Sequence, residues 1–433
     1  MRRLRDTHLL VAAVGVSSLG DFLVWIPLTL HLERTTGSGL AVAGLMICLW
    51  APAVLLAPVA GLLADRIESQ KLLVAGSITQ AAVAASLALV LDSVAATLAL
   101  TALLGAGIAI TQPAEFALVP AVARGQNLRA MNGTVESARY AGMTAGPILG
   151  GLLAAAGGTS IALLVNAATF AFVAAAAALL RTRRPPVSGA HTRASAFDGV
   201  VHLFRDRTLA LVVSVVLVSL LFMSAAITAE VFFLKGDLGV GDALYGVLFS
   251  SWTVGMVVGA LVVAQRIPAR ALAVVALLAV AVQGVGLALP TAWVAAGFVA
   301  AAWFVGGAAH GVKNTLMRTL IQERVPDHLH GRAYAAYNGL RNGAELAALA
   351  SGGAFVALLG ARPTLALAGA LPALAALVGL VVFSRAGGLR ALRPRFAPTA
   401  SAAGAPQPLS SASVRAAIVS APAMPSSASP TER

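Results

Sequence analysis

The chain has 433 residues, of which 59% are hydrophobic and only 11% are charged, and its formal net charge at pH 7 is +13. Soluble domains contain roughly 45–50% apolar and about 25% charged residues, so this composition excludes an ordinary soluble protein. The abundance of Ala, Leu, Val and Gly favours helices that pack closely in a lipid bilayer.

Long apolar segments follow one another along the chain, and each is close to the length of about 20 residues that a helix needs to cross a bilayer. They lack the alternating polarity of barrel strands. The first has no cleavage pattern of small residues, so no removable signal peptide is predicted. The sequence predicts twelve membrane-spanning helices, at residues 8–31, 39–64, 72–91, 94–121, 131–156, 159–180, 208–234, 243–264, 271–290, 292–320, 333–359 and 364–384.

The basic residues are distributed unevenly between the predicted loops. With the N-terminus inside, the external loops hold only Arg34, Lys235 and Arg362, whereas most of the 30 Lys and Arg residues fall on the cytoplasmic side. This asymmetry follows the positive-inside rule and predicts that both termini are cytoplasmic. The net charge therefore indicates topology rather than a nucleic-acid partner. The Ala and Arg content is typical of a GC-rich bacterium, so we expect the bacterial cell (inner) membrane.

A basic linker divides the spans into two sets of six. Apolar residues recur at helical spacing between Phe197 and Phe204, which predicts a short amphipathic helix. This helix either lies on the inner membrane surface or extends the seventh span. The tail is rich in Ala, Pro and Ser, and we expect it to be disordered. The predicted parts are a first six-helix bundle at 1–180, a linker at 181–207, a second six-helix bundle at 208–384 and a cytoplasmic tail at 385–433.

The two sets of spans carry similar short sequences. Residues 64–67 (ADRI) recur as residues 264–267 (AQRI), and Arg139 recurs as Arg341 at nearly the same offset. A consistent offset favours two halves that arose as a parallel repeat.

Gly61, Asp65 and Arg66 lie in a polar loop between the second and third predicted spans. This pattern resembles the loop between helices 2 and 3 of the major facilitator superfamily of transporters. The resemblance implies an all-α membrane protein with twelve helices in two six-helix bundles related by pseudo-two-fold symmetry. It also implies conformational gating, in which Asp65 faces the start of span 11 near Arg332 and latches the outward-open state. The alternative is a solvated loop charge.

The fifth predicted span contains a glycine and proline pattern. It resembles the GxxxGPxxGG motif associated with antiporters of the superfamily. Glycines four residues apart form a flat helix face for close packing, and proline permits a bend. The alternative is general packing of small residues. The motif comprises Gly142, Gly146, Pro147, Gly150 and Gly151.

Further segments resemble the exporter branch that includes macrolide-efflux and enterobactin-export proteins. They are residues 112–120, which read QPAEFALVP, residues 320–326, which read LIQERVP, and the pairs Gly20-Asp21 and Gly331-Arg332. The Arg and Gly motif often seen in span 4 of proton antiporters is absent. The resemblance covers residues 8–384 and implies export without identifying the cargo.

Two pairs of ionisable residues inside the spans can neutralise themselves. Glu136 and Arg139 are three residues apart, and Arg341 and Glu345 are four apart, so each pair shares one helix face. Charged side chains are costly in a membrane, by about 2.5–3.5 kcal/mol each on insertion scales. We therefore interpret both pairs as structural ion pairs.

Asp21 and Glu115 have no basic residue three or four positions away. In the superfamily fold, spans 1, 4, 7 and 10 line the central cavity, so the resemblance places both carboxyls there. A carboxyl in that setting can exchange protons, which predicts a role in proton coupling or in the substrate cavity. Lys313 in span 10 is the expected cationic partner across the cavity. For Asp21 the alternative is a hydrogen bond to Ser17 or Ser18.

No enzyme signature, phosphate-binding loop or metal-ligand cluster occurs in the sequence, and Cys48 is the single cysteine. We expect no cofactor and no direct use of ATP. The partners expected are a small-molecule substrate, protons and membrane lipids, and the chain is expected to act as a monomer. The sequence thus predicts a secondary transporter that exports a hydrophobic or amphipathic molecule by proton antiport. The alternatives are a proton-coupled importer and a receptor or scaffold with the same fold.

Overall fold

The computed structural model describes residues 2–37, 39–124, 127–155, 158–186, 197–224 and 226–386. These residues are almost entirely helical, and no strand occurs among them. The first half comprises α1 (Arg2–Leu23), α2 (Trp25–Thr36), α3 (Gly39–Leu55), α4 (Ala57–Arg66), α5 (Ser69–Leu87), α6 (Val94–Val122), α7 (Leu128–Ala155) and α8 (Thr159–Leu179). The predicted disordered tail lies outside the described residues from 387 onward.

A short helix, α9 (Asp198–Arg205), precedes the second half. The longer helices of that half are α10 (Arg207–Met223), α11 (Ala226–Phe232), α12 (Asp242–Val258), α13 (Leu272–Ala288), α14 (Ala296–Arg324), α15 (His330–Leu359) and α16 (Ala361–Arg385). Its short helical turns are η1 (Phe233–Asp237), η2 (Gly259–Val263), η3 (Ala264–Arg266), η4 (Ala269–Ala271), η5 (Leu289–Thr291) and η6 (Asp327–Leu329).

Each of the twelve predicted spans falls on one helix or on a broken pair. Spans 1, 2 and 7 are the broken ones, formed by α1 with α2, α3 with α4, and α10 with α11. The α3–α4 break bends the chain by 56°, and a proline lies in the first turn of α4, where its missing N–H costs little. The twelve-helix architecture is therefore consistent with the structure.

Length and apolar composition alone identify fewer spans. Six of the described helices pass such a test, or up to eight if each bent pair counts as one span. The long helices α7, α14 and α15 have 28, 29 and 30 residues, so each could cross a bilayer. Ionisable residues midway along them lower their apolar character, and some of these residues, among them Glu136, Arg139 and Arg318, belong to the candidate site described below.

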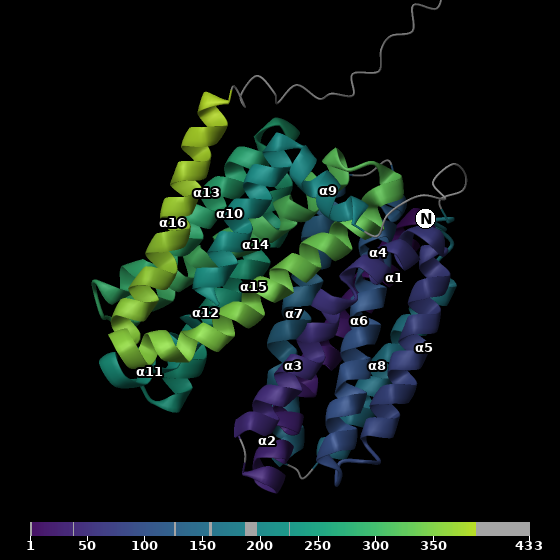
Figure 1. The fold of residues 1–433 in the computed structure, drawn as a ribbon, viewed down its shortest axis with the longest axis horizontal. Coiled ribbons are helices and arrows are strands. Elements are labelled where there is room, and N and C mark those ends of the chain that lie inside the picture. The colour runs from purple at the N-terminus through teal and green to yellow at the C-terminus, as the bar shows by residue number, and fades with distance from the viewer. Residues whose placement is uncertain are drawn as a thin grey trace, which may run out of the picture. The chain divides into compact units, whose positions relative to one another are not determined.

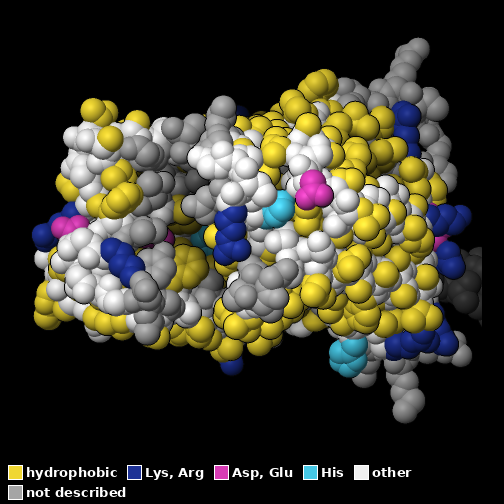
Figure 2. Space-filling view, turned by 90° about the horizontal axis from the view of Figure 1, so that it is seen from below, with side chains coloured by type: hydrophobic (Ala, Val, Ile, Leu, Met, Phe, Trp, Pro, Cys, Tyr) yellow, Lys and Arg dark blue, Asp and Glu magenta, His cyan; other side chains and the backbone are white. Residues whose placement is uncertain are grey.

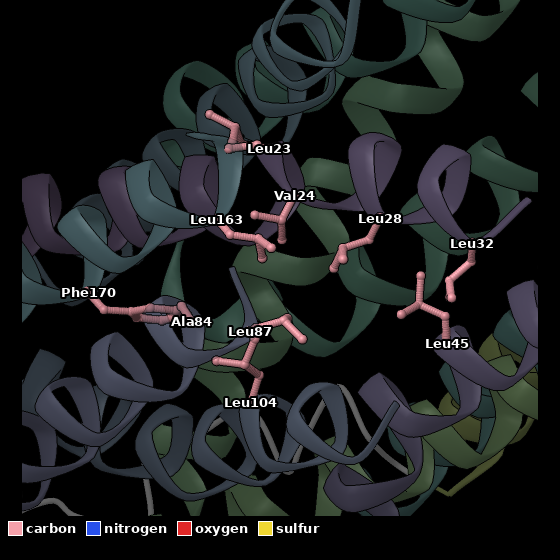
Figure 3. Packing of buried hydrophobic residues seen from close by; sticks show 11 residues of the cluster. Leu23, Val24, Leu28, Leu32, Leu45, Ala84, Leu87, Leu104, Leu163 and Phe170 are labelled. Atoms are coloured by element: carbon pink, nitrogen blue, oxygen red, sulfur yellow. The ribbon is translucent and has the colours of Figure 1, made fainter. Parts of the chain in front are cut away.

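Figure 1 shows α1–α8 in purple to blue as one group of helices and α10–α16 in teal to yellow as another. Within the first group, α2, α3, α5, α6 and α8 enclose a cluster of buried apolar side chains (Figure 3). Leu32, Leu87 and Leu163 in this cluster are completely buried. Burial of a leucine side chain contributes about 1.5–3 kcal/mol relative to water, so such clusters define where the helices meet.

Large apolar side chains are also abundant on the outside. Leu89 is 83% exposed and Leu55 is 75% exposed, and many other Leu, Val, Ile and Phe residues resemble them. Figure 2 shows hydrophobic side chains spread across one face, with few acidic or basic side chains among them. Large apolar surfaces of this kind are typical of contact with lipid rather than water.

The linker helix α9 turns sharply away from the span that follows it. The α9–α10 pair bends by 104°, so α9 does not continue along the axis of α10. Its Val201 is 59% exposed and its Leu203 is fully buried. At Gly199 a Cβ atom would collide with the backbone of Arg332, so glycine permits the close approach of α9 to α15. We refer below to the end of the bundles where linker residues 181–186 lie as the linker end.

Candidate functional site: a linker-end latch and a polar chamber

Asp65 at the end of α4 joins the two halves. Its side chain is buried, and its carboxylate accepts hydrogen bonds from the backbone N–H groups of Gly331 (3.1 Å) and Arg332 (3.2 Å). Arg332 Nε also donates to it at 3.0 Å. A carboxylate is stabilised there because the first turn of α15 presents unpaired N–H groups. The sequence predicted this contact, and the alternative of a solvated loop charge is wrong.

Of the predicted loop motif, Gly61 and Asp65 contribute to this contact between the halves, and Arg66 does not. At Gly61 a Cβ atom would lie 2.6 Å from the Cα atom of Arg332, so only glycine lets α4 approach α15 this closely. Arg66 is exposed, and no ion pair or side-chain hydrogen bond of Arg66 occurs within the described residues. Arg184 from the linker instead lies 3.1 Å from Asp65 and donates to the Asp327 carbonyl at 2.7 Å. Sequence reasoning missed Arg184 because it lies 119 positions from Asp65 in the chain.

Two more contacts of the linker lie beside the Asp65–Arg332 contact between the halves. Arg332 Nη1 lies 3.0 Å from Asp198 in α9, which ties the linker helix to the first turn of α15. Arg183 donates to Glu68 at 2.7 Å, and this bond is the main cause that lowers the pKa of the partly buried Glu68 carboxyl. We define the latch as Asp65, Arg184, Asp198 and Arg332. It draws on both halves and on the linker between them.

The predicted antiporter-like motif forms the contact between α7 and α1. A Cβ atom at Gly142 would lie 2.5 Å from the Gly15 carbonyl, and one at Gly146 would lie 2.7 Å from the Leu19 carbonyl. At Gly150 it would collide with the backbone of Leu23. These glycines recur every fourth residue and face α1, whereas Gly151 has open space beside it. The helix continues through Pro147.

A small cavity lies inside the first half, between α1, α5, α6, α7 and α8. Asp21, Glu115 and Arg139 line it, together with the polar side chains of Ser17, Ser77, Gln80, Thr111 and Gln112. We call this cavity the polar chamber. A second cavity adjoins it at Asp21 and Ile108 and is lined mainly by apolar residues, among them Trp25 and Phe170. Both cavities lie within one half, so a substrate cavity between the halves stays a prediction.

Glu115 and Arg139 form an ion pair across the polar chamber. Arg139 Nη2 lies 2.5 Å from Glu115 Oε1, and Arg139 Nε lies 3.5 Å from Glu136 of its own helix. The intrahelical pair was predicted from the spacing of the two residues. The partner of Glu115 was missed because the two lie on different helices, 24 positions apart.

Asp21 differs from Glu115. No hydrogen bond or ion pair of its carboxyl occurs among the described residues, and Arg139 and Glu115 are the charged groups that act on it electrostatically. Ser18, one of its predicted partners, donates to the Arg139 carbonyl instead at 2.8 Å. Asp21 is thus the carboxyl of the polar chamber that is left without a direct partner in the described structure.

The ion pairs of the chamber continue into the second half. Glu136 Oε1 lies 2.5 Å from Arg318 Nε in α14, and Arg318 Nη2 donates to the Tyr334 hydroxyl at 2.8 Å. Asn338 in α15 donates to Gln112, which lines the chamber, at 2.9 Å. An unbroken series of charges therefore links Glu115 to the opposite half. Arg318 carried a usable sequence signal, because it lies in a predicted span without an acidic residue three or four positions away.

Lys313 does not meet the carboxyls of the first half in this structure. Its side chain is completely buried, and the charged groups that act on it are Arg341 and Glu345. Arg341 and Glu345 form the predicted intrahelical ion pair, with Nη2 and Oε1 2.9 Å apart. The predicted partnership of Lys313 with Asp21 or Glu115 across a cavity stays a prediction.

A family model described as Major Facilitator Superfamily matches residues 10–349, which is most of the chain. The chain belongs to this superfamily. It is therefore a transporter with several membrane-crossing helices, and its expected carriage of a small molecule is consistent with membership. No curated protein matches the sequence.

Solved structures of other superfamily transporters share the fold. The human organic anion transporter MFSD10 (TETRAN) is 17% identical, with a TM-score of 0.71 over 88% of this chain and 100% of that one. A bacterial homologue of the iron transporter ferroportin, in an outward-facing state, is 17% identical, with a TM-score of 0.71 over 88% and 99% of the two chains. A structure of a bacterial ferroportin homologue soaked with iron, also outward-facing, gives 16% identity and a TM-score of 0.68, over 88% of this chain and 98% of that one. Identities this low establish the fold and leave the cargo open.

Proposed function

We propose that this transporter exports a hydrophobic or amphipathic small molecule in exchange for protons, in the drug/proton antiporter branch of the superfamily. The observation that carries the proposal is Asp21, a carboxyl that has no direct partner among the described residues and lines both cavities of the first half. A group that gains and loses protons during transport needs such a position, since a fixed ion pair would hold its charge.

The two adjoining cavities support an amphipathic cargo. One is rich in polar groups and the other is lined by side chains such as Trp25, Leu28 and Phe170, and Asp21 lies where they meet. Ligand sites of transporters typically combine a largely apolar lining with a few placed polar groups. A drug, antibiotic or secondary metabolite, including a siderophore, has this mixed character.

The series of charges from the chamber supplies a route for coupling. When Asp21 takes a proton, Arg139 loses a neighbouring negative charge and turns more fully to Glu136. Glu136 then holds Arg318 of the other half less strongly, because two cations share one carboxylate. Protonation inside the first half thereby weakens a contact between the halves, which favours their rearrangement.

We use the latch to assign this structure to one conformational state of the transport cycle. The charge distribution predicts that the linker end faces the cytoplasm, and the halves are joined there through Asp65, Arg184 and Arg332. The structure then corresponds to an outward-open state. Opening of the latch would expose the site to the cytoplasm, as alternating access by rocking of the two halves requires.

The proton gradient suffices for this task. One proton that crosses a potential of about 150 mV releases roughly 3.5 kcal/mol, at about 2.3 kcal/mol per 100 mV. That free energy sustains a substrate gradient of several hundredfold, at about 1.4 kcal/mol per factor of ten. A gradient of this size is enough to keep the intracellular concentration of a toxic compound low.

A toxicity screen tests the proposal. Cells with and without the protein are exposed to a panel of drugs and secondary metabolites, and the screen is repeated with Asp21→Asn. The proposal predicts that the protein raises tolerance to at least one compound, lowers its intracellular concentration, and loses both effects in the variant. An importer would raise the intracellular concentration instead. Asp92→Asn is the matched control, since Asp92 is an exposed loop residue.

A further inference from the structure

Lys313 in α14 is a buried cation that has no direct partner in the described part of the chain. Its side chain is 0% exposed, and its Nζ atom has no hydrogen-bond partner among the described residues. Burial of an uncompensated ammonium inside a membrane protein is costly. A residue that is only structural would therefore be expected to carry a bound carboxylate nearby, as Arg139 and Arg341 do.

The groups around Lys313 leave its positive charge uncompensated. The acting charges are Arg341 and Glu345, and Glu345 already accepts from Arg341 at 3.0 Å. Two cations thus face one carboxylate. His310 lies one helical turn from Lys313, and its Nδ1 atom is also buried, with no hydrogen-bond partner in the segments that the structure describes. Two polar groups on one helix face, three residues apart, can reach the same ligand.

The location fits a molecule that moves between the halves. Trp252 in α12 lies edge-on to the His310 ring, with ring centroids 5.9 Å apart, and packs against a cluster that includes Tyr140 of α7. The neighbouring Asn314 donates to the Tyr140 hydroxyl at 2.8 Å, so this stretch of α14 borders the first half. A ligand would reach the covered ammonium when the halves part along that boundary.

We propose that Lys313 and His310 form an anion-binding subsite, with Trp252 at its edge, which holds the carboxylate group of the transported molecule. The inference rests on the proposed transport function, because it names the class of cargo: amphipathic organic acids. The ammonium supplies a charge-assisted hydrogen bond, the imidazole supplies a second donor from Nδ1, and Trp252 contacts the apolar part. Arg341 adds positive potential, and Glu345 tempers it.

Binding to the full-length protein in lipid nanodiscs tests the subsite without any gradient. Tryptophan fluorescence follows titration with cyclohexanecarboxylate, with its neutral amide cyclohexanecarboxamide, and with sodium chloride alone. A charge-assisted hydrogen bond is worth about 1.5–3 kcal/mol, which corresponds to roughly 10- to 100-fold in affinity. We expect the carboxylate to bind at least about tenfold more tightly than the amide. Trp252→Phe should reduce the signal while a melting-temperature shift with the carboxylate persists.

Matched variants separate the subsite from a structural lysine. Lys313→Met should abolish the preference for the carboxylate without lowering the melting temperature, because it removes a buried charge that has no bound partner. His310→Gln should weaken the preference by a smaller factor. Lys71→Met, at a lysine whose side chain is 72% exposed, should retain the full preference.

Other outcomes overturn the inference. Equal affinity for the carboxylate and the amide, no binding of either, or an unchanged preference in Lys313→Met would each do so. Chloride alone producing the same response at the same concentration would indicate a site for small inorganic ions instead. Failure of proton-driven export is a separate result, since binding is measured without a membrane potential or a pH difference.

Discussion

Arg318 Nε of α14 lies 2.5 Å from Glu136 Oε1 of α7, so the two halves are joined by an ion pair in the interior of the bundles. Both side chains are largely buried, at 9% and 4% exposure. Glu136 also lies 3.5 Å from Arg139, which holds Glu115 in the polar chamber. The carboxylate of Glu136, which joins the halves, therefore also contacts Arg139, the arginine that lines the polar chamber with Asp21.

Removal of either partner of this pair should favour separation of the halves at the linker end. Loss of one member of a buried pair costs about 3–5 kcal/mol, because the other charge stays buried alone. We expect Glu136→Gln and Arg318→Gln each to raise the labelling rate of a cysteine at Ala335, in a Cys48→Ser background, by tenfold or more. Ala335 is 3% exposed and faces Gly61 of the other half. The double variant should label more slowly than the product of the two single effects; simple additivity would argue against a direct pair.

The latch should respond to loss of the Asp65 carboxylate. Asp65→Asn removes the negative charge that accepts from Gly331, Arg332 and Arg184, and hydrogen bonds to charged groups contribute about 1.5–3 kcal/mol each. The same cysteine at Ala335 should label about tenfold faster or more. Asp92→Asn, which alters an exposed loop carboxyl, should leave the rate unchanged. An equal rate in both variants would contradict the latch.

Glycine substitutions should distinguish the two faces of the antiporter-like motif. Gly146→Ala places a Cβ atom 2.8 Å from that of Phe22 and 2.7 Å from the Leu19 carbonyl, so α1 and α7 must separate. Overpacking costs about 1–3 kcal/mol. We expect a lower melting temperature in detergent, whereas Gly151→Ala, which meets open space, should retain the wild-type value. Equal losses in both variants would mean that close packing of α1 on α7 is not the role of the motif.

Local patterns in the sequence predicted local structure and two local ion pairs. The spacing of Glu136 and Arg139, and of Arg341 and Glu345, sufficed because one helix fixes both positions. The contact of Asp65 with the start of α15 was also anticipated, through resemblance to a known loop. The pairs Glu115–Arg139 and Asp65–Arg184 were not, since each joins two different elements and no periodicity encodes which side chains of separate elements meet.

Sequence patterns also do not show which helices meet at the candidate site. The sequence singled out Asp21 because it lacks a nearby base, and the structure leaves its carboxyl without a direct partner, whereas Glu115 was singled out on the same ground and is paired. A carboxyl that has no basic partner on its own helix can therefore still pair with a base on a neighbouring helix, as Glu115 does with Arg139. The apolar cavity beside Asp21 depends on the packing of five helices, α1, α2, α3, α6 and α8, and no local pattern in the sequence predicts which of them meet.

Topology offers an independent prediction. Reporter fusions placed after residues 35, 92 and 237 should report an extracellular position, because these sites lie in or next to the predicted external loops. Fusions after residue 184 should report the cytoplasm, since Arg183 and Arg184 belong to the basic segments that are retained inside. Cytosolic signals from the first three sites would contradict the assigned orientation.

The most direct test of the central claim is proton movement in everted membrane vesicles that hold the protein. Respiration acidifies the vesicle interior, and a pH-sensitive dye then reports protons that leave when a compound found in the toxicity screen is added. The account predicts rapid proton exit with the wild type and with Asp92→Asn, and none with Asp21→Asn. Proton exit that persists undiminished in Asp21→Asn would contradict the assignment of this carboxyl as the coupling group, and uptake of the compound without any proton movement would contradict antiport itself.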